Sequence, residues 1–130
     1  MEDFVTYKIA KKLEEKGFEQ GFNIFGCRPI YSDKETIKFI SNIGAYESDY
    51  FGENISCPPI SQVLKWLRNK KAIHIDIAIW EGGWYCDVWV YEFYKEEKEY
   101  LTLIRHQSDD YKSYEDAALA GIDYVLDNLI

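Results

Sequence analysis

The sequence predicts a single α+β domain, residues 1–130, with an antiparallel sheet of four or five strands and three helices packed mainly on one face. One observation is that residues 73–106 alternate apolar and polar side chains in three runs, the pattern of an antiparallel meander. The second is that apolar residues recur at helical spacing elsewhere, which predicts helices over about 4–16, 59–70 and 113–129. The third is the length, 130 residues, which is that of one typical domain.

The composition is acidic and aromatic. Fifteen Lys and Arg stand against 23 Asp and Glu, which gives a formal net charge of −8, and aromatic residues make up 17% of the chain. Because such a charge repels phosphate backbones, direct nucleic-acid binding is not expected. Met1–Phe4 opens with acidic residues, and no apolar run reaches the length of a signal peptide or a membrane span. We therefore expect a cytoplasmic protein without membrane contact.

The first predicted helix, over about 4–16, has recognisable signals at both ends. Its apolar face consists of Val5, Ile9 and Leu13. Asp3 is expected to cap the N-terminus. Gly17 suits the left-handed residue that follows a helix, and Phe18 is then expected to fold back on Leu13 in a Schellman cap.

Residues 18–57 predict a loose hairpin followed by an acidic loop. The alternating apolar residues are Phe22 and Ile24 on one side, and Ile37, Phe39 and Ile43 on the other. Tyr31–Lys34 between them has the composition of a turn. The loop, 44–57, carries Glu47, Asp49 and Glu53.

Two further helices complete the helical prediction. Pro58 and Pro59 suit the first turn of the helix over 59–70. Its apolar positions are Ile60, Val63, Leu64 and Leu67, and its basic cluster is Lys65, Arg68, Lys70 and Lys71. Cations at a helix C-terminus interact favourably with the dipole, so the cluster needs no ligand to explain it. Ser113 is expected to cap the last helix, with Asp116 completing an approximate capping box.

The meander has a predicted register. Gly82-Gly83 between two alternating runs is typical of a two-residue hairpin turn. The resulting pairs on the apolar face are Ile79–Cys86, Ile77–Val88 and Ile75–Val90. The third strand, 99–106, is expected to add the pairs Val90–Leu103 and Glu92–Leu101 to this face, and the pair Phe93–Tyr100 to the opposite face. Apolar side chains then gather on one face, as a correct register requires.

The opposite face of the meander is the predicted binding surface. Its residues are His74, Asp76, Trp80, Tyr85, Asp87, Trp89, Tyr91 and His106. The expected pairs are His74–Tyr91, Asp76–Trp89, Trp80–Tyr85 and Asp87–His106. Aromatic rings supply contact area, whereas carboxylates and imidazoles supply directional polar contacts. We therefore expect another protein as the partner. The structural alternative is that a further layer covers this face, or that the aromatic pairs only stabilise the sheet.

Three of these side chains also allow an enzymatic alternative. Asp76 and Asp87 form a carboxylate pair, and Asp87 with His106 forms an acid/base dyad, either of which could act on a small ligand. No nucleophile or oxyanion device accompanies them, so no catalytic residue is assigned and an enzyme is not expected. A metal site from His74, Asp76 and His106 would need two separate strands to meet, so no metal or cofactor is expected.

The cysteines fit a reducing compartment. They are Cys27, Cys57 and Cys86. Their spacing lacks the paired arrangement of a zinc site, and an odd number leaves one thiol outside any set of disulfides. We therefore expect reduced thiols.

Three stretches together resemble a known family. They are Phe4–Phe18, Pro58–Ile75 and Ser113–Ile130, about half of the chain. The chain resembles small uncharacterised proteins from gut anaerobic bacteria, their phages and mobile elements. The resemblance implies an intracellular protein and allows a phage or mobile-element origin. It carries over no activity, cofactor or catalytic residue.

These observations favour a non-enzymatic accessory or protein-binding module. The alternative is a nucleic-acid-mimicking inhibitor of a host nucleic-acid enzyme, because carboxylates can imitate phosphates. Residues 33–53 hold two cations and five carboxylates, net −3, and residues 105–127 hold two and six, net −4. The second alternative is the small-ligand enzyme described above, and a homodimer is compatible with each.

Overall fold

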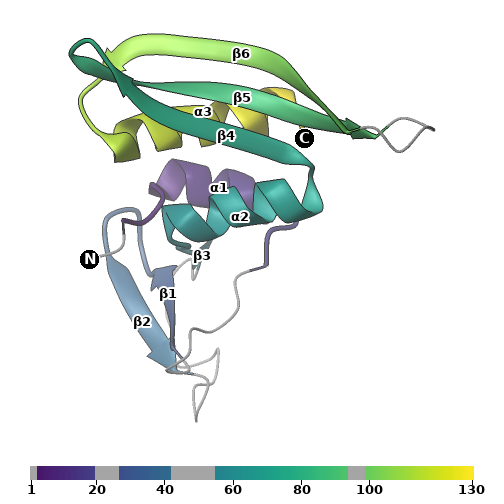
Figure 1. Cartoon of the computed structure of the whole chain (residues 1–130). Helices are drawn as coiled ribbons and strands as arrows, with labels where there is room; N and C mark the ends of the chain where they lie inside the picture. The colour runs from purple at the N-terminus through teal and green to yellow at the C-terminus, as the bar shows by residue number, and fades with distance from the viewer. Residues whose placement is uncertain (1–2, 20–26, 42–54, 94–98) are drawn as a thin grey trace. The chain divides into compact units, whose positions relative to one another are not determined.

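The computed structural model describes residues 3–19, 27–41, 55–93 and 99–130 (Figure 1). These residues form three helices and six strands, which confirms the α+β class. The chain divides into two compact units at Pro59, and each unit is described by itself. Whether the chain is a single domain stays a prediction.

The prediction of one sheet with four or five strands is wrong. The described strands form two three-stranded antiparallel sheets, in the orders β2-β1-β3 and β4-β5-β6. The third strand of the first sheet is β3, Ile55–Ser56, which pairs with β1 on the edge opposite β2, so the hairpin is extended by these two residues and not by the meander. The sequence analysis placed these two residues in a loop.

The first unit contains α1 (Tyr7–Glu15), β1 (Cys27–Tyr31) and β2 (Ile37–Ser41) besides β3. A hairpin is confirmed here, with Asp33 accepting hydrogen bonds from the backbone N–H of Glu35 and Thr36 in its turn. The prediction that Tyr31 belongs to the turn is wrong, because Tyr31 ends β1 and pairs with Ile37. Helix α1 packs against β3 in this unit. The remaining predicted positions Phe22, Ile24, Ile43 and the acidic residues of 44–54 lie outside the described residues.

Helix α1 begins later than predicted, and its cap is a different residue. The side chain of Thr6 accepts a hydrogen bond from the N–H of Ile9 at 3.3 Å, so the prediction of Asp3 as the cap is wrong. The reason is that the preceding residues are held in extended pairing. Val5 N–H donates to Pro58 O at 3.1 Å, and Phe4 bridges to Pro59.

The C-terminus of α1 is a Schellman cap, as predicted. Gly17 has a φ of 82°, which lies in the left-handed region that glycine adopts without strain. Phe18 N–H donates to Leu13 O at 3.0 Å, and Gly17 N–H donates to Glu14 O at 3.2 Å. This cap fixes the buried ring of Phe18 beside the end of the helix.

The second unit contains α2 (Ile60–Lys70), β4 (Ile73–Trp80), β5 (Gly83–Phe93), β6 (Glu99–Tyr111) and α3 (Tyr114–Asn128). The predicted apolar stripe of α2 is buried, and Ser113 caps α3 by accepting from Asp116 N–H at 3.1 Å. Helix α3 lies along one face of the sheet, and α2 packs against β4 and α3 (Figure 1).

The isoleucine face of this sheet lies under α3. A Cβ atom added to Gly121 would be 2.9 Å from Ile75 Cγ2 and 3.4 Å from Cys86 Sγ, so the helix backbone approaches the sheet closely there. Ile73 and Ile75 are buried, whereas Ile79 is 62% exposed, so the helical cover stops before the hairpin end.

The turn between β4 and β5 is Glu81-Gly82, one residue before the predicted position. Both residues have positive φ, 29° and 98°, as a type I′ turn requires. The predicted register would place the buried Ile73 opposite Glu92, whereas the observed register places it opposite Val90. Every predicted β4–β5 pair is therefore wrong by two positions. Because side chains alternate with a period of two, each residue still keeps its predicted face.

A β-bulge between Val88 and Trp89 changes the pairing with β6. Asp87 lies opposite His106, as predicted. Beyond the bulge the predictions are wrong by one residue, and the observed pairs are Val90–Thr102, Glu92–Tyr100 and Phe93–Glu99. Since an odd shift exchanges faces, Leu103 lies opposite Trp89 rather than Val90. The outer face is therefore more apolar than predicted.

Candidate functional site

The candidate site is the outer face of the β4-β5-β6 sheet, opposite the face that packs against α3. Seven predicted site residues lie on this face by register, and their side chains are described: His74, Asp76, Tyr85, Asp87, Trp89, Tyr91 and His106. Trp80 belongs to the same face by alternation along β4. The seven described residues therefore share one face, and of the four predicted pairs only Asp87–His106 is observed.

An ionisable row crosses all three strands. Asp76 lies directly opposite Asp87, and Asp87 lies directly opposite His106. His106 Nδ1 donates to Asp87 Oδ1, forming an ion pair when the imidazole is protonated. The side chain of Asp87 is 16% exposed and that of His106 is 52% exposed. The row therefore presents one compensated carboxylate and one exposed carboxylate.

Aromatic side chains flank this row. The ring of Tyr85 lies 5.4 Å from the imidazole of His106, with 52° between the planes. On the other side, Trp89 lies opposite His74 and Leu103, and Leu103 is 46% exposed. His74 Nδ1 is buried without a hydrogen-bond partner among the described residues. Rings beside carboxylates can bind a cation by its charge and by its apolar stem.

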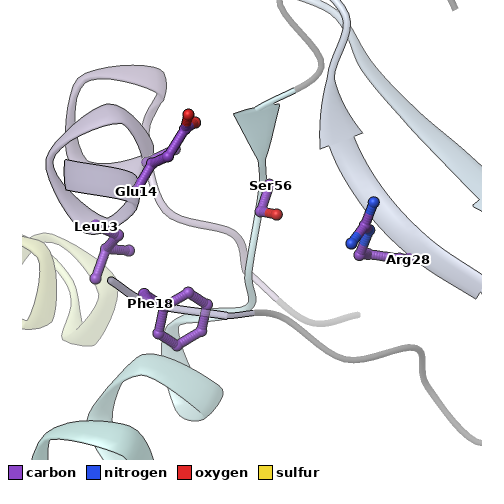
Figure 2. A pocket seen from close by; sticks show the side chains of 6 residues that line it. Leu13, Glu14, Phe18, Arg28 and Ser56 are labelled. Atoms are coloured by element: carbon purple, nitrogen blue, oxygen red, sulfur yellow. The ribbon is translucent and has the colours of Figure 1, made fainter. Parts of the chain in front are cut away.

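A second feature is a pocket of about 220 Å³ in the first unit (Figure 2). It is lined by Ala10, Leu13, Glu14, Phe18, Arg28 and Ser56. Figure 2 shows Leu13 and Glu14 on α1, Ser56 on β3 and Arg28 on β1. The sequence analysis missed this pocket. The i, i+3, i+4 spacing of the three α1 residues was its only local signal.

The thiol of Cys57 is buried and stays protonated at neutral pH. Burial raises the pKa of Cys57 to about 11, and burial also raises the pKa of the neighbouring Tyr31. Tyr31 Oη donates to Val5 O. Both groups therefore hold their protons at neutral pH and act structurally. Cys86 is fully buried against the helical side of the sheet, as predicted.

The predicted alternatives can be placed on this structure. In the described part of the chain, no three His, Cys, Asp or Glu side chains are grouped so that they could hold a metal ion. The Asp76–Asp87 pair is directly cross-strand rather than diagonal as expected. Among the described helices, none is long and apolar enough to cross a membrane.

Comparisons with protein-family models, with curated proteins and with solved structures found no match. The resemblance to proteins of gut anaerobes and their phages therefore stays a prediction.

Proposed function

We propose that this chain is a non-enzymatic protein-binding module whose contact surface is the outer face of the β4-β5-β6 sheet, and whose partner presents an arginine or lysine side chain there. The observation that carries the proposal is the row Asp76, Asp87 and His106 with Tyr85 and Trp89 on either side.

Electrostatics favours a cationic partner. Like charges directly opposite each other on neighbouring strands destabilise a sheet, and Asp76 faces Asp87 in this way. His106 compensates Asp87, whereas Asp76 is exposed and makes no ion pair within the described ranges. A cation about 4 Å from a carboxylate near a protein surface gains roughly 1–4 kcal/mol. The net charge of −8 attracts such a partner at longer range.

The aromatic rings supply the apolar part of the contact. A cation over an aromatic face contributes about 0.5–2 kcal/mol, and its methylene stem can pack on neighbouring apolar surface. Trp89 and Tyr85 are half-buried, and the bulge adds the exposed Leu103 to the same face. Aromatic rings together with a charged group are typical of protein interaction surfaces.

The location of the dyad supports binding rather than catalysis. Enzymes usually place acid/base groups in a concave pocket, where water is excluded. His106 is half exposed on a sheet face, and neither His106 nor Asp87 lines the pocket of Figure 2. The Asp87–His106 pair then positions a carboxylate for a partner.

The proposal is tested by titrating the ¹⁵N-labelled protein with a Gly-Arg-Gly-Arg-Gly peptide, blocked at both ends, and with its glutamine counterpart. Arginine peptide is expected to shift the backbone amides around Asp76 and Trp89, with weaker binding as salt rises. Asp76→Asn should weaken binding at least threefold, whereas the matched control Asp3→Asn should not. Equal shifts from the glutamine peptide, or shifts confined to α3, would overturn the proposal.

A further inference from the structure

We infer that the exposed face of α2 binds a short acidic segment of a partner protein. This face, the cationic face, consists of Lys65, Arg68 and Lys70 with the following Lys71, and the half-buried Trp66 lies at its border. It shares no residue with the outer sheet face of the proposed function. The inference therefore adds a second contact, of opposite charge, and does not depend on that proposal.

The cationic face carries a single sign of charge. Residues 55–75 hold four cations and no carboxylate, although the whole chain has a net charge of −8. The exposed side of α1 is different, because Lys8 and Lys11 lie there together with Glu14 and Glu15. Charges of both signs keep a helix surface soluble without favouring a charged partner, whereas a single sign attracts the opposite one.

The cations are available to another molecule. Lys65, Arg68 and Lys70 are exposed, and none of them forms an ion pair, a hydrogen bond or a ring contact with another residue of the described ranges. The helix dipole favours cations within the last turn, which contains Arg68 and Lys70. Lys65 precedes that turn, so the dipole does not account for the whole face.

The end of the helix that carries these charges is held in place. Lys71 N–H donates to Leu67 O at 3.1 Å, and the following Ala72 has a φ of 56°. The carbonyl of Ala72 accepts a hydrogen bond from Tyr91 N–H at 2.9 Å, which ties this end to β5. Lys71 Nζ lies 5.4 Å from the centroid of the Trp66 ring. Because the backbone and Lys71 are already ordered, a partner loses less freedom on binding them.

The dimensions of the cationic face favour a peptide. The 11 residues of α2 extend over about 16 Å, the length of about five residues of an extended chain. Lys65 and Arg68 are three residues apart on the helix, so their Cβ atoms are about 5–6 Å apart. Alternate residues of an extended chain are separated by roughly 6.6 Å. A segment with carboxylates at alternate positions therefore matches the face.

The charge outside the cationic face disfavours larger anions. Removing the four cations from the net charge of −8 leaves −12 for the rest of the chain. A nucleic acid or an anionic membrane extends beyond the face and is repelled by these carboxylates. An acidic peptide of about five residues can stay within the face.

The test is a ¹⁵N chemical-shift titration of the full chain with Glu-Gly-Glu-Gly-Glu, blocked at both ends, and with the corresponding glutamine peptide. The glutamate peptide is expected to shift the amides of residues 65–71, and raising NaCl from about 20 to about 150 mM should weaken its binding at least threefold. Equal shifts from the two peptides, or no shift of these amides at low salt, would overturn the inference.

Further probes distinguish other occupants of the cationic face. A thymidine oligonucleotide and vesicles containing phosphatidylserine are expected to bind more weakly than the glutamate peptide at about 150 mM NaCl. Tighter binding of either would overturn the assignment to a peptide. The same amides should not shift when the protein alone is concentrated. Such a shift would identify a second copy of this chain as the occupant and overturn the inference of a separate partner.

Variants assign the contact to particular side chains. Lys65→Gln and Arg68→Gln should each weaken the glutamate peptide at least about twofold, whereas Lys65→Arg should bind it as the unmodified chain does. Lys8→Gln is the matched control, because Lys8 is an exposed helical lysine outside the cationic face. Equal losses in Lys65→Gln and Lys8→Gln would contradict the inference and indicate general charge attraction. Asp76→Asn should not weaken the glutamate peptide, so this contact and the proposed function are tested separately.

Discussion

The burial of two side chains, Tyr31 and Cys57, makes the stability of the first unit depend on pH in the alkaline range. Both are buried, and burial raises both pKa values above the ordinary ones. The Tyr31 hydroxyl donates a hydrogen bond to Val5 O, which lies 26 residues earlier in the sequence, in the segment that leads into α1. Ionising either group in place would leave a charge without water, so the folded state retains both protons.

The free energy of unfolding should therefore fall between pH 9 and pH 11. In the unfolded chain the Cys57 thiol loses its proton near its ordinary pKa of 9.0, whereas the folded protein holds the proton to about 11. Folding takes up a proton in this window, so stability decreases as pH rises, by about 2 kcal/mol at most. Urea titrations at intervals from pH 8 to 11 measure this loss.

The control for this measurement is Cys57→Ala. This variant should be less stable at pH 8, because it leaves a cavity, but its stability should decline less steeply up to pH 10. Above pH 10 the raised pKa of Tyr31 adds a further loss in both proteins. Parallel curves for the two proteins from pH 8 to 10 would contradict the assignment to Cys57.

At the scale of elements, the position of the β4–β5 turn is decided by side-chain packing in the sheet and not by the local turn preference of the sequence. Two glycines at 82 and 83 form the stronger local signal for a turn, yet the chain turns at Glu81-Gly82. This register places the buried Ile73 beside the half-buried Val90 on the helical side, and this outweighs the cost of a non-glycine residue at positive φ.

Glu81→Asn should stabilise the protein by about 0.5–1 kcal/mol. Asparagine tolerates the left-handed region, and Asn-Gly is the preferred pair for a type I′ turn. Chemical denaturation gives the change. Glu81→Gln is the matched control, since it removes the same charge without the backbone preference, and it should leave stability within about 0.3 kcal/mol. Equal gains in the two variants would point to charge rather than turn geometry.

The elements that the sequence predicts well are those with a periodic pattern. The faces of β4 and β5 follow from alternation, and the stripe of α2 follows from helical spacing, so all of the outer-face residues are found together. Predicting the cross-strand partner of each residue requires the positions of bulges and short strands as well. The bulge at Val88 has no local signal, and β3 is only two residues long. The pocket was not predictable because Arg28 and Ser56 meet α1 only through long-range packing.

At the scale of the whole molecule, the chain divides into two units, and the strands described in each unit form a sheet of their own. The strands of the first unit have five, five and two residues, whereas those of the second have eight, eleven and thirteen. Local opening free energy increases with buried apolar contact and with paired backbone. The two sheets should therefore differ in how readily their amides become exposed to solvent.

Hydrogen exchange should separate the two units. Amides of β1 and β2 are expected to exchange at least tenfold faster than those at the centre of β5, because β5 pairs with long strands on both sides and packs against α3, whereas β1 pairs with β3 at only two residues. Exchange detected by mass spectrometry on peptides from each strand measures the difference. A common protection factor for β1 and β5 would instead indicate one cooperative unit.

The bulge at Val88–Trp89 has a consequence for how β6 can vary. On one side of Ile104 the strand contributes Leu103 opposite Trp89, and on the other it contributes Arg105, whose guanidinium lies 4.6 Å from the ring of Tyr124 on α3. Deleting Ile104 would make Leu103 and Arg105 consecutive, so the pairs Trp89–Leu103 and Val88–Arg105 would follow each other in a regular ladder and each side chain would keep its face. A homologue lacking this one residue would therefore lose the bulge and keep both contacts, so a one-residue gap at position 104 leaves the two faces of β6 unchanged.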